Sequence, residues 1–318
     1  MLILSQEIYW QFKKLLERRV SMKYVIGVDA GGTKTEAVAY SLQGEHIQKS
    51  VTGFGNLLND SETALNNIEE SIKNIVCNLA ESDLDGIYIG AAGAEVDINA
   101  ELIKQKISSS FNVNVEVMND AEIALKAKLK GDDGILTIAG TGSIAFGINN
   151  GISSKCGGWG NLLGDEGSGY KIAIDAIKQM IKEEEEDLEQ SRLTKNILEK
   201  LNIKSVNEIT KFVYSSTKDE IASLTPIVAK LGEEGDEIAR KILISEATEL
   251  GKTVKKLYKK LGFKKCKIAL VGGVIRKSKV VREVFEEYLS KNINVTEIID
   301  NDISPTKGAY YIYIKNKN

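Results

Sequence analysis

Apolar positions along residues 24–129 follow strand and helix patterns in turn. Short apolar runs at Tyr24–Asp29, Thr35–Tyr40 and Ile47–Thr52 predict three strands, with a glycine turn between the first two. From Ser61 to Glu81, apolar residues recur every three or four positions, which predicts an amphipathic helix. Further along, the pattern predicts strand Ile87–Ala91, helix Ala100–Ser108, strand Val113–Met118 and helix Glu122–Leu129.

The pattern then starts again. Strands are predicted at Ile135–Ala139 and Ile144–Ile148, around a second glycine turn. The helix Tyr170–Ile181 runs into the acidic residues Glu183–Asp187, which we interpret as a solvated loop or helix end. Residues 190–260 are predicted to be mostly helical. The last predicted elements are strand Lys267–Val271, helix Val280–Leu289, strand Val295–Ile299 and a closing helix Thr306–Lys315.

The strand, glycine turn and strand of residues 24–40 therefore recur at 135–148. Two copies of one α/β unit facing across a cleft would explain the repeat, each with a mixed sheet and helices on its faces. We place the first domain at residues 22–118 plus the closing segment 305–318, and the second at 119–304 with a helical insertion. Residues 1–21 have helical spacing; we favour an upstream start codon, with Met22 as the true beginning, over an ordered extension.

Composition excludes several classes of function. The 42 basic and 45 acidic residues leave a formal charge of -3, whereas a dedicated nucleic-acid binder usually has a basic excess. The longest apolar run, Ile268–Ile275, is far below the roughly 18 residues that span a bilayer. The first residues lack the basic region of a signal peptide. We therefore expect a cytoplasmic protein that binds neither nucleic acid nor membranes.

Histidine and cysteine are scarce. His46 is the single histidine, so a catalytic triad would depend on that one residue. The three cysteines, Cys77, Cys156 and Cys266, are far apart in sequence, which argues against a disulfide framework or a cysteine-rich zinc site.

Two glycine turns are candidate phosphate cradles, because glycines let backbone N–H groups converge on an anion. The first is Asp29-Ala30-Gly31-Gly32-Thr33-Lys34, in which Thr33 adds a hydroxyl, Lys34 a cation and Asp29 a possible Mg²⁺ ligand. It is no Walker A loop, since a strand follows it. The second is Ala139-Gly140-Thr141-Gly142-Ser143. One such turn alone fits an ordinary hairpin equally well, but two copies in matching positions favour phosphate binding. The pair Gly272-Gly273, where a buried strand ends and a helix begins, is by itself weaker evidence for a ligand site.

Acceptor chemistry points to two further segments. Asn119-Asp120 follows a predicted strand, and Asp120 is either a helix cap or the base that accepts a hydroxyl proton in phosphoryl transfer. The segment from Cys156 to Tyr170 is rich in glycine and in polar groups. There Asp165 is either a helix-end residue or a sugar-hydroxyl acceptor, and Trp159 could form an apolar wall. Asn56 is a turn residue or a substrate ligand.

Taken together, these motifs resemble the N-acetylglucosamine kinase branch of the sugar kinase, actin and heat-shock ATPase superfamily. The resemblance extends from about Met22 to the closing helix, and Cys156-Gly157-Gly158-Trp159-Gly160 followed by Gly164-Asp165-Glu166-Gly167-Ser168 is its most specific part. It implies two RNase-H-like domains that close over ATP and a sugar, in a homodimer.

The resemblance also implies roles for single residues. Asp120 would be the base on the sugar 6-hydroxyl and Asp29 would organise Mg²⁺. The ATP ligands would be Gly31, Gly32, Thr33, Lys34, Gly140, Thr141, Gly142, Ser143, Gly272 and Gly273, and the sugar ligands Asn56, Asn119, Gly158, Trp159 and Asp165.

The sequence therefore predicts an ATP-dependent N-acetylhexosamine kinase. The alternative is an activator ATPase of a 2-hydroxyacyl-CoA dehydratase, a related class that holds an iron–sulfur cluster between subunits. Such a cluster needs several thiolates, and the position of Cys156 inside the sugar-type motif ranks this alternative second. The sequence does not distinguish among N-acetylglucosamine, N-acetylmuramic acid, N-acetylmannosamine and glucosamine.

Overall fold

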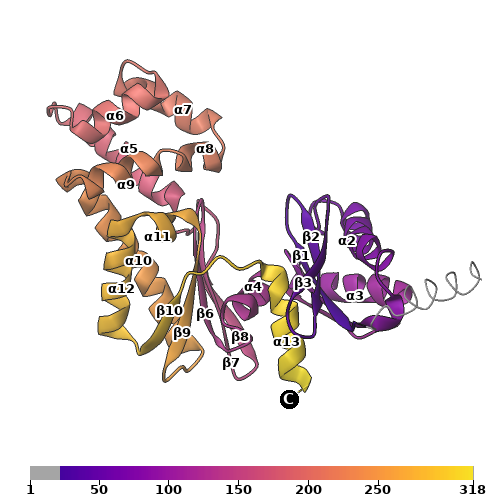
Figure 1. Ribbon diagram of the computed structural model, residues 1–318. Helices are drawn as coiled ribbons and strands as arrows, with labels where there is room; N and C mark the ends of the chain where they lie inside the picture. Colours follow the sequence, from indigo (N-terminus) through magenta and orange to yellow (C-terminus); the bar gives the residue numbers. More distant parts are fainter. Residues whose placement is uncertain (1–21, 318) are drawn as a thin grey trace, which may run out of the picture. The chain divides into compact units, whose positions relative to one another are not determined.

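The computed structural model describes residues 22–317, and the chain folds as two compact units (Figure 1). The first comprises the described residues up to Gly131 together with those from Ile303 onward, and the second is Asp132–Asp302. Residues 1–21, for which the sequence leaves an upstream start codon and an extension as alternatives, lie outside the described residues. In the described part of the chain, every helix is too short or too polar to span a bilayer.

The first unit is built on a five-stranded mixed sheet in the order β3-β2-β1-β4-β5. Neighbours in β1, β2 and β3 run antiparallel, whereas β1, β4 and β5 are parallel. The carboxyl ends of β1, β4 and β5 consequently share one edge of the sheet. The strands are β1 (Tyr24–Ala30), β2 (Thr35–Ser41), β3 (His46–Thr52), β4 (Leu84–Ala91) and β5 (Val115–Asn119).

Helices cover both faces of this sheet. On one face, Ile68 and Ile72 of α2 and Ile103 of α3 join the core of buried strand residues. On the other, α13 packs on β1 and α4 on β4, with Ala309 and Tyr313 of α13 buried. The helices are α2 (Ser61–Val76), α3 (Asn99–Ser110), α4 (Asp120–Lys128) and α13 (Gly308–Lys317), with short 3₁₀ turns η1 (Glu81–Asp83) and η3 (Pro305–Lys307).

The second unit repeats the arrangement, with a sheet in the order β10-β9-β6-β7-β8. Here β6 pairs antiparallel with β7 and β7 with β8, while β6, β9 and β10 are parallel. Each sheet thus combines a three-stranded meander with two further strands that run parallel to its first strand, and the first two strands of each meander are the repeat that the sequence predicts. The strands are β6 (Gly134–Ala139), β7 (Ser143–Asn149), β8 (Ile152–Gly157), β9 (Cys266–Val271) and β10 (Val295–Ile299).

A helical insertion enlarges the second unit. Helices α5 to α9 gather beyond one end of the sheet, at the top of Figure 1, while α10 and α12 pack along each other. The helices are α5 (Gly169–Glu185), α6 (Arg192–Leu201), α7 (Ile209–Ser215), α8 (Lys218–Ala222), α9 (Thr225–Glu233), α10 (Glu237–Lys260), α11 (Gly273–Lys277) and α12 (Lys279–Asn292), with the 3₁₀ turn η2 (Val206–Glu208).

The mixed α/β fold with two sheets is confirmed, but details differ from the prediction. Helix α4, assigned to the second domain from the sequence, belongs to the first unit, because it packs on α13, η3 and β4. Strand β8 was not predicted, since its residues 152–155 are polar or exposed along an edge. Within the acidic run, Glu183 is not solvated: it is 2% exposed and accepts hydrogen bonds from Ser191 and Thr194.

Candidate functional site

The first glycine turn is short and open to solvent. It links β1 to β2, and the Gly31 N–H donates to the Lys34 carbonyl at 2.9 Å. Gly32 has open space where a side chain would begin, while a methyl group at Gly55 would lie 2.6 Å from the Ala30 Cβ. The loop that contains Gly55 therefore packs against one side of the turn, and the side at Gly32 stays accessible to an anion.

Two carboxylates meet beside this turn. Asp29 lies next to the end of β1, and Asp120 is the first residue of α4. Burial, followed by the negative charges of Asp120 and Glu36, raises the pKa of Asp29 to about 6, although Lys34 opposes the shift. A half-buried carboxyl group near another carboxylate can bind a hard divalent cation, which prefers oxygen ligands. The pair therefore fits a magnesium site.

Asn119, rather than Asp120, caps helix α4. Its Oδ1 accepts a hydrogen bond from the Ala121 N–H at 2.8 Å, and its Nδ2 donates to Glu95 Oε2 at 2.6 Å. Asp120 Oδ1 also accepts from the Ala121 N–H at 2.8 Å. Asn56 lies in the loop after β3, where its Oδ1 accepts from the Leu58 N–H. The helix start thus fixes the Asp120 side chain at the edge where β1, β4 and β5 end.

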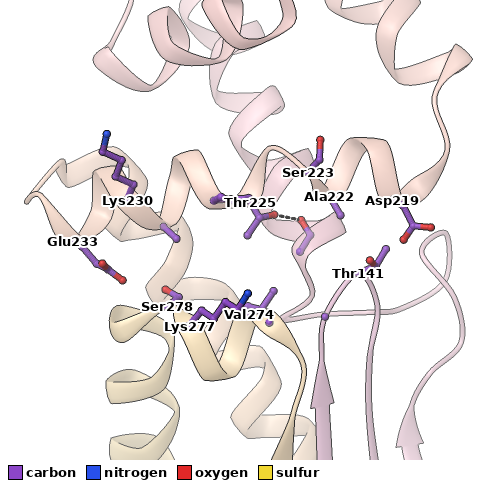
Figure 2. A pocket seen from close by; sticks show the side chains of 15 residues that line it. Thr141, Asp219, Ala222, Ser223, Thr225, Lys230, Glu233, Val274, Lys277 and Ser278 are labelled. Atoms are coloured by element: carbon purple, nitrogen blue, oxygen red, sulfur yellow. Dashed lines mark hydrogen bonds between the residues drawn. The ribbon is translucent and has the colours of Figure 1, made fainter.

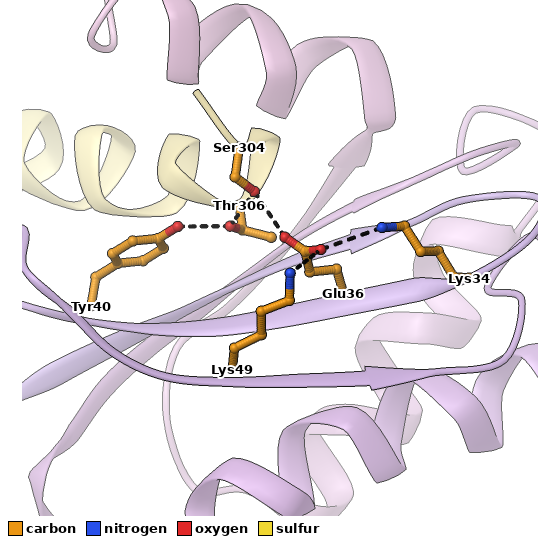
Figure 3. Close-up of polar contacts among 6 residues, drawn as sticks. All are labelled: Lys34, Glu36, Tyr40, Lys49, Ser304 and Thr306. Atoms are coloured by element: carbon orange, nitrogen blue, oxygen red, sulfur yellow. Dashed lines mark hydrogen bonds and ion pairs between the residues drawn. The ribbon is translucent and has the colours of Figure 1, made fainter. Parts of the chain in front are cut away.

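Lys34 contacts a carboxylate instead of extending from the turn. Its Nζ lies 3.5 Å from Glu36 Oε2, where Lys49 also binds at 2.7 Å (Figure 3). The Ser304 hydroxyl donates to Glu36 Oε1 at 3.1 Å, which links β2 to the segment that enters η3. Burial opposes ionisation of Glu36, but hydrogen bonds from Lys49 and Ser304 hold its pKa below the ordinary value. Glu36 therefore stays ionised and paired with Lys34 and Lys49.

The second glycine turn, between β6 and β7, is anchored to the start of α5. The Gly169 N–H donates to the Gly140 carbonyl at 2.7 Å, and the Tyr170 N–H to the Thr141 carbonyl at 3.2 Å. The Ser143 hydroxyl is used inside the fold, because it donates to the Glu166 carbonyl at 2.7 Å. Backbone groups and the Thr141 hydroxyl are consequently what this turn can offer a phosphate.

A cavity of about 640 Å³ opens beside this turn, entirely within the second unit (Figure 2). Gly140 and Thr141 form one wall, and Gly273 and Val274 at the start of α11 form another. The volume suits a bound nucleoside-sized ligand. Residues from the insertion and α11 complete the lining: Gly169, Asp219, Ala222, Ser223, Thr225, Pro226, Ala229, Lys230, Glu233, Lys277 and Ser278.

Gly272 has a backbone that only glycine adopts readily. Its φ is +103°, and a methyl group there would lie 2.3 Å from the Ala139 carbonyl oxygen. This close approach lets α11 begin directly beside the second glycine turn. The glycine pair that was weak evidence in the sequence therefore lies next to the stronger motif, and Gly273 reaches the cavity.

The glycine loop (residues 157–168) presents one buried acid and one exposed aromatic ring. Asp165 is 4% exposed and has a left-handed backbone with φ of +65°. A methyl group at Gly142 would lie 2.8 Å from Asp165 Oδ2, so the carboxylate adjoins the second glycine turn. Trp159 is 70% exposed. The loop can thus offer a fixed acceptor for hydroxyl groups and an apolar surface.

The predicted residues accordingly form one group in each unit. Asp29, the first turn, Asn56, Asn119 and Asp120 gather at one sheet edge of the first unit; Gly140–Ser143, Asp165 and the Gly272-Gly273 pair gather in the second. The cavity residues of α8 and α9 were not predicted from the sequence, because they lie in a predicted helical region that has no motif. Pro226, one of two prolines, was the sole local signal there, since proline favours a helix start.

The cysteines are separated in the structure. Cys77 is exposed after α2 in the first unit, Cys156 is partly buried in β8, and Cys266 is buried in β9. Burial raises the pKa of the Cys266 thiol to about 12, which keeps it protonated. Among residues 22–317, no cluster of three or more histidine, cysteine or acidic side chains has the geometry of a metal site.

Comparison with known proteins covers nearly the whole chain. The family model of the BadF/BadG/BcrA/BcrD ATPase family matches residues 26–311. An N-acetylmuramic acid/N-acetylglucosamine kinase from Clostridium acetobutylicum is 35% identical over 300 residues, with 92% of this chain and 98% of that protein covered. An N-acetyl-D-glucosamine kinase from Dictyostelium discoideum is 29% identical, with 94% and 100% covered.

Solved structures share the fold. A candidate N-acetylglucosamine kinase from Chromobacterium violaceum superposes with a TM-score of 0.67 at 21% identity, covering 92% of this chain and 99% of that one. A ROK family glucokinase from Streptomyces griseus, solved with glucose and AMPPNP, gives a TM-score of 0.54 at 16% identity, covering 93% and 100%. At these identities the likeness shows the architecture alone.

Proposed function

Because this chain belongs to the BadF/BadG/BcrA/BcrD ATPase family, we propose that it is an ATP- and Mg²⁺-dependent kinase of an N-acetylated amino sugar, most simply N-acetylglucosamine. Two relatives aligned over more than nine-tenths of the chain carry kinase names with this sugar in them. The observation that carries the proposal is the pair of carboxylates, Asp29 and Asp120, beside an open glycine turn.

ATP would bind through backbone groups. We assign Gly31, Gly32 and Thr33 to the phosphates from the first turn, and Gly140–Ser143 from the second. The cavity in the second unit has room for the adenosine, with Gly272 and Gly273 at its edge. Lys34 could bind a phosphate only if its Nζ moved away from Glu36 Oε2, which lies 3.5 Å from it.

Asp29 is the residue that would hold Mg²⁺. The dication would neutralise charge on the ATP phosphates when bound. The raised pKa of Asp29 supports this assignment, because after burial, which is its largest cause, it reflects the negative charges of Asp120 and Glu36, which a cation would offset.

Asp120 would be the general base. As the sugar 6-hydroxyl oxygen forms its bond to the γ-phosphorus, the bond from that phosphorus to the β,γ-bridging oxygen breaks and ADP leaves. The hydroxyl proton passes to the Asp120 carboxylate. Its place as the first residue of α4, fixed by the Ala121 N–H, supports a defined side-chain orientation for this step.

The residues that we assign to the sugar come from the sequence motifs of each unit. We assign Asn56 and Asn119 from the first, and Gly158, Trp159 and Asp165 from the second. Asp165 can accept hydrogen bonds from sugar hydroxyl groups, and Trp159 can pack against the apolar face of a pyranose ring. The expected homodimer and the cytoplasmic location stay predictions.

An ADP-release assay tests the function. Protein, ATP and Mg²⁺ are combined with N-acetylglucosamine, N-acetylmuramic acid, N-acetylmannosamine, glucosamine, glucose or no sugar. We expect release that depends on an N-acetylated sugar and yields one sugar phosphate per ADP. Hydrolysis independent of sugar would contradict the proposal and favour an ATPase that acts on a partner protein.

A further inference from the structure

A buried carboxylate lies beneath the glycine loop, outside every motif considered above. Glu246 is in the middle of α10 and is 6% exposed. Its Oε2 accepts a hydrogen bond from the Gly167 N–H at 2.6 Å. A hydrogen bond between a backbone N–H and a carboxylate is short and strong compared with one between neutral groups. This contact is therefore a candidate anchor for the loop.

The loop rests directly on α10 at this point. Gly167 has φ of +80°, and a methyl group there would lie 2.5 Å from the Leu250 Cβ and 3.0 Å from the Glu246 carbonyl oxygen. No side chain could be added without moving the loop off the helix. Gly167 is thus required both by its backbone conformation and by the contact with α10.

The anchored residue is close in sequence to the proposed sugar acceptor. The Ser168 N–H donates to the Asp165 carbonyl at 3.0 Å, and the Ser143 hydroxyl donates to the Glu166 carbonyl at 2.7 Å. These two bonds and the Glu246 contact restrain residues 165–168 from both sides. Asp165, which has a left-handed backbone and little exposure, has few other conformations available while they persist.

We propose that Glu246 is the positioning residue of the glycine loop: by accepting the Gly167 N–H, it holds Asp165 beside the second glycine turn in the conformation that receives the sugar. This inference rests on the proposed function for the identity of the ligand. The anchoring itself is a property of the free protein and can be measured without turnover.

The surroundings of Glu246 make the anchor responsive to pH. Burial raises the pKa of Glu246 to about 7, and the nearby Asp175 of α5 adds to the shift. The Gly167 N–H and Lys171, also on α5, act in the opposite direction. The Gly167 N–H by itself lowers the pKa of Glu246, which means that it binds the ionised carboxylate more strongly than the protonated one. As long as Glu246 stays buried, this hydrogen bond therefore strengthens as the Glu246 and Asp175 pair loses its proton near pH 7.

Trp159 provides a direct reporter within the same loop. The sequence has two tryptophans, and Trp10→Phe leaves Trp159 as the single one. In this background we expect the emission of Trp159 to change with a midpoint near pH 7. Glu246→Gln, which keeps the shape of the side chain but cannot ionise, should abolish that transition. The matched control is Glu249→Gln, which removes a carboxylate on the same helix that pairs with Lys252 at the surface.

Two further measurements complete the test. Amide exchange of the loop should be at least tenfold faster in Glu246→Gln than in Glu249→Gln. For an active enzyme, the KM for the sugar should rise tenfold or more in Glu246→Ala and less in Glu246→Gln, with kcat changed less than threefold; in the parent it should fall from pH 6 to pH 8.

The outcomes separate the two proposals. A pH transition and loop exchange that are the same in Glu246→Gln and Glu249→Gln would overturn the anchoring role, whatever the enzyme phosphorylates. An unchanged sugar KM with altered exchange would overturn the link to Asp165. Absence of sugar turnover in every variant would contradict the proposed function, while fluorescence and exchange would still decide whether Glu246 anchors the loop.

Discussion

At the scale of single residues, ionisation of Asp29 lowers the free energy of unfolding. Its pKa is raised to about 6 in the folded chain, whereas an ordinary aspartate has a pKa of 3.8. The folded state therefore binds a proton more tightly, and stability is lost as pH rises from about 4 through 6. A carboxylate that lowers stability at neutral pH and has a strongly shifted pKa is typical of a ligand-binding or catalytic site.

Asp29→Asn should consequently stabilise the protein in the absence of metal. At pH 7.5 with EDTA, we expect the free energy of unfolding to increase by about 1–3 kcal/mol, with a difference that shrinks toward pH 4. Urea titrations at several pH values measure it. Glu70→Gln, which changes an exposed acid on α2, is the control and should have little effect. Equal or lower stability of Asp29→Asn at pH 7.5 would contradict the electrostatic account.

Asp120→Asn tests the proposed base. Asparagine retains the side-chain shape and can accept from the Ala121 N–H, but it cannot take a proton at neutral pH. We expect kcat to fall by about 10²–10⁴-fold with a KM for the sugar within a few fold of the parent. Glu122→Gln, on the same helix, serves as the control. Wild-type turnover by Asp120→Asn would remove Asp120 from the catalytic step.

At the scale of elements, Glu183 shows how the end of α5 is closed. Its carboxylate accepts hydrogen bonds from the Thr194 hydroxyl at 2.6 Å and from the Ser191 N–H at 2.9 Å, which joins α5 to the start of α6. Burial opposes ionisation, yet hydrogen bonds led by that of Gln179 hold the pKa of Glu183 below its ordinary value. The stability it contributes is present at neutral pH and lost in acid.

We predict that Glu183→Ala lowers the free energy of unfolding by about 1–3 kcal/mol, because it leaves buried donors without an acceptor. The exposed neighbour Glu185 offers a matched control, and Glu185→Ala should change stability by less than about 0.5 kcal/mol. Thermal unfolding followed by circular dichroism compares the two. Similar effects of both substitutions would show that the acidic run behaves as a solvated surface.

The same elements show what sequence patterns could and could not predict. Buried strands such as β1 and β6 and long amphipathic helices were predicted because their apolar spacing is strong. Strand β8 was not predicted, because an edge strand exposes polar side chains and lacks a strong apolar pattern. Glu183 and Glu246 look like surface residues in sequence, because apolar spacing does not show which donors will surround a carboxylate. The donors to Glu183 lie 4 to 11 residues away, whereas the Gly167 N–H is 79 residues from Glu246.

The candidate site follows the same division. The two glycine turns can be recognised in sequence, because clustered glycine and hydroxyl residues between two apolar runs form a local pattern. The cavity lining from α8 and α9 could not, because an insertion folds into place only through tertiary packing and bears no local signature.

At the scale of the whole molecule, the residues proposed for each ligand come from both repeated units. The resemblance to sugar kinases that the motifs indicated is confirmed by relatives aligned over more than nine-tenths of the chain. If each ligand orders groups of both units, binding of one reduces the cost of binding the other.

We therefore predict positive coupling between sugar and nucleotide. N-acetylglucosamine should strengthen the binding of a non-hydrolysable ATP analogue by about fivefold or more in the presence of Mg²⁺, and the analogue should strengthen sugar binding by the same factor. Isothermal titration in both orders measures the two factors. Independent binding would show that the units act separately on their ligands.

The identity of the product tests directly whether this protein phosphorylates the 6-hydroxyl of N-acetylglucosamine with Asp120 as the base. Wild-type protein and Asp120→Asn are incubated with ATP, Mg²⁺ and N-acetylglucosamine, and the products are examined by ³¹P–¹H correlation NMR. We expect the wild type to attach phosphate to the 6-oxygen and Asp120→Asn to make almost no sugar phosphate. Phosphate on another oxygen, release of free phosphate alone, or equal product from both proteins would contradict it.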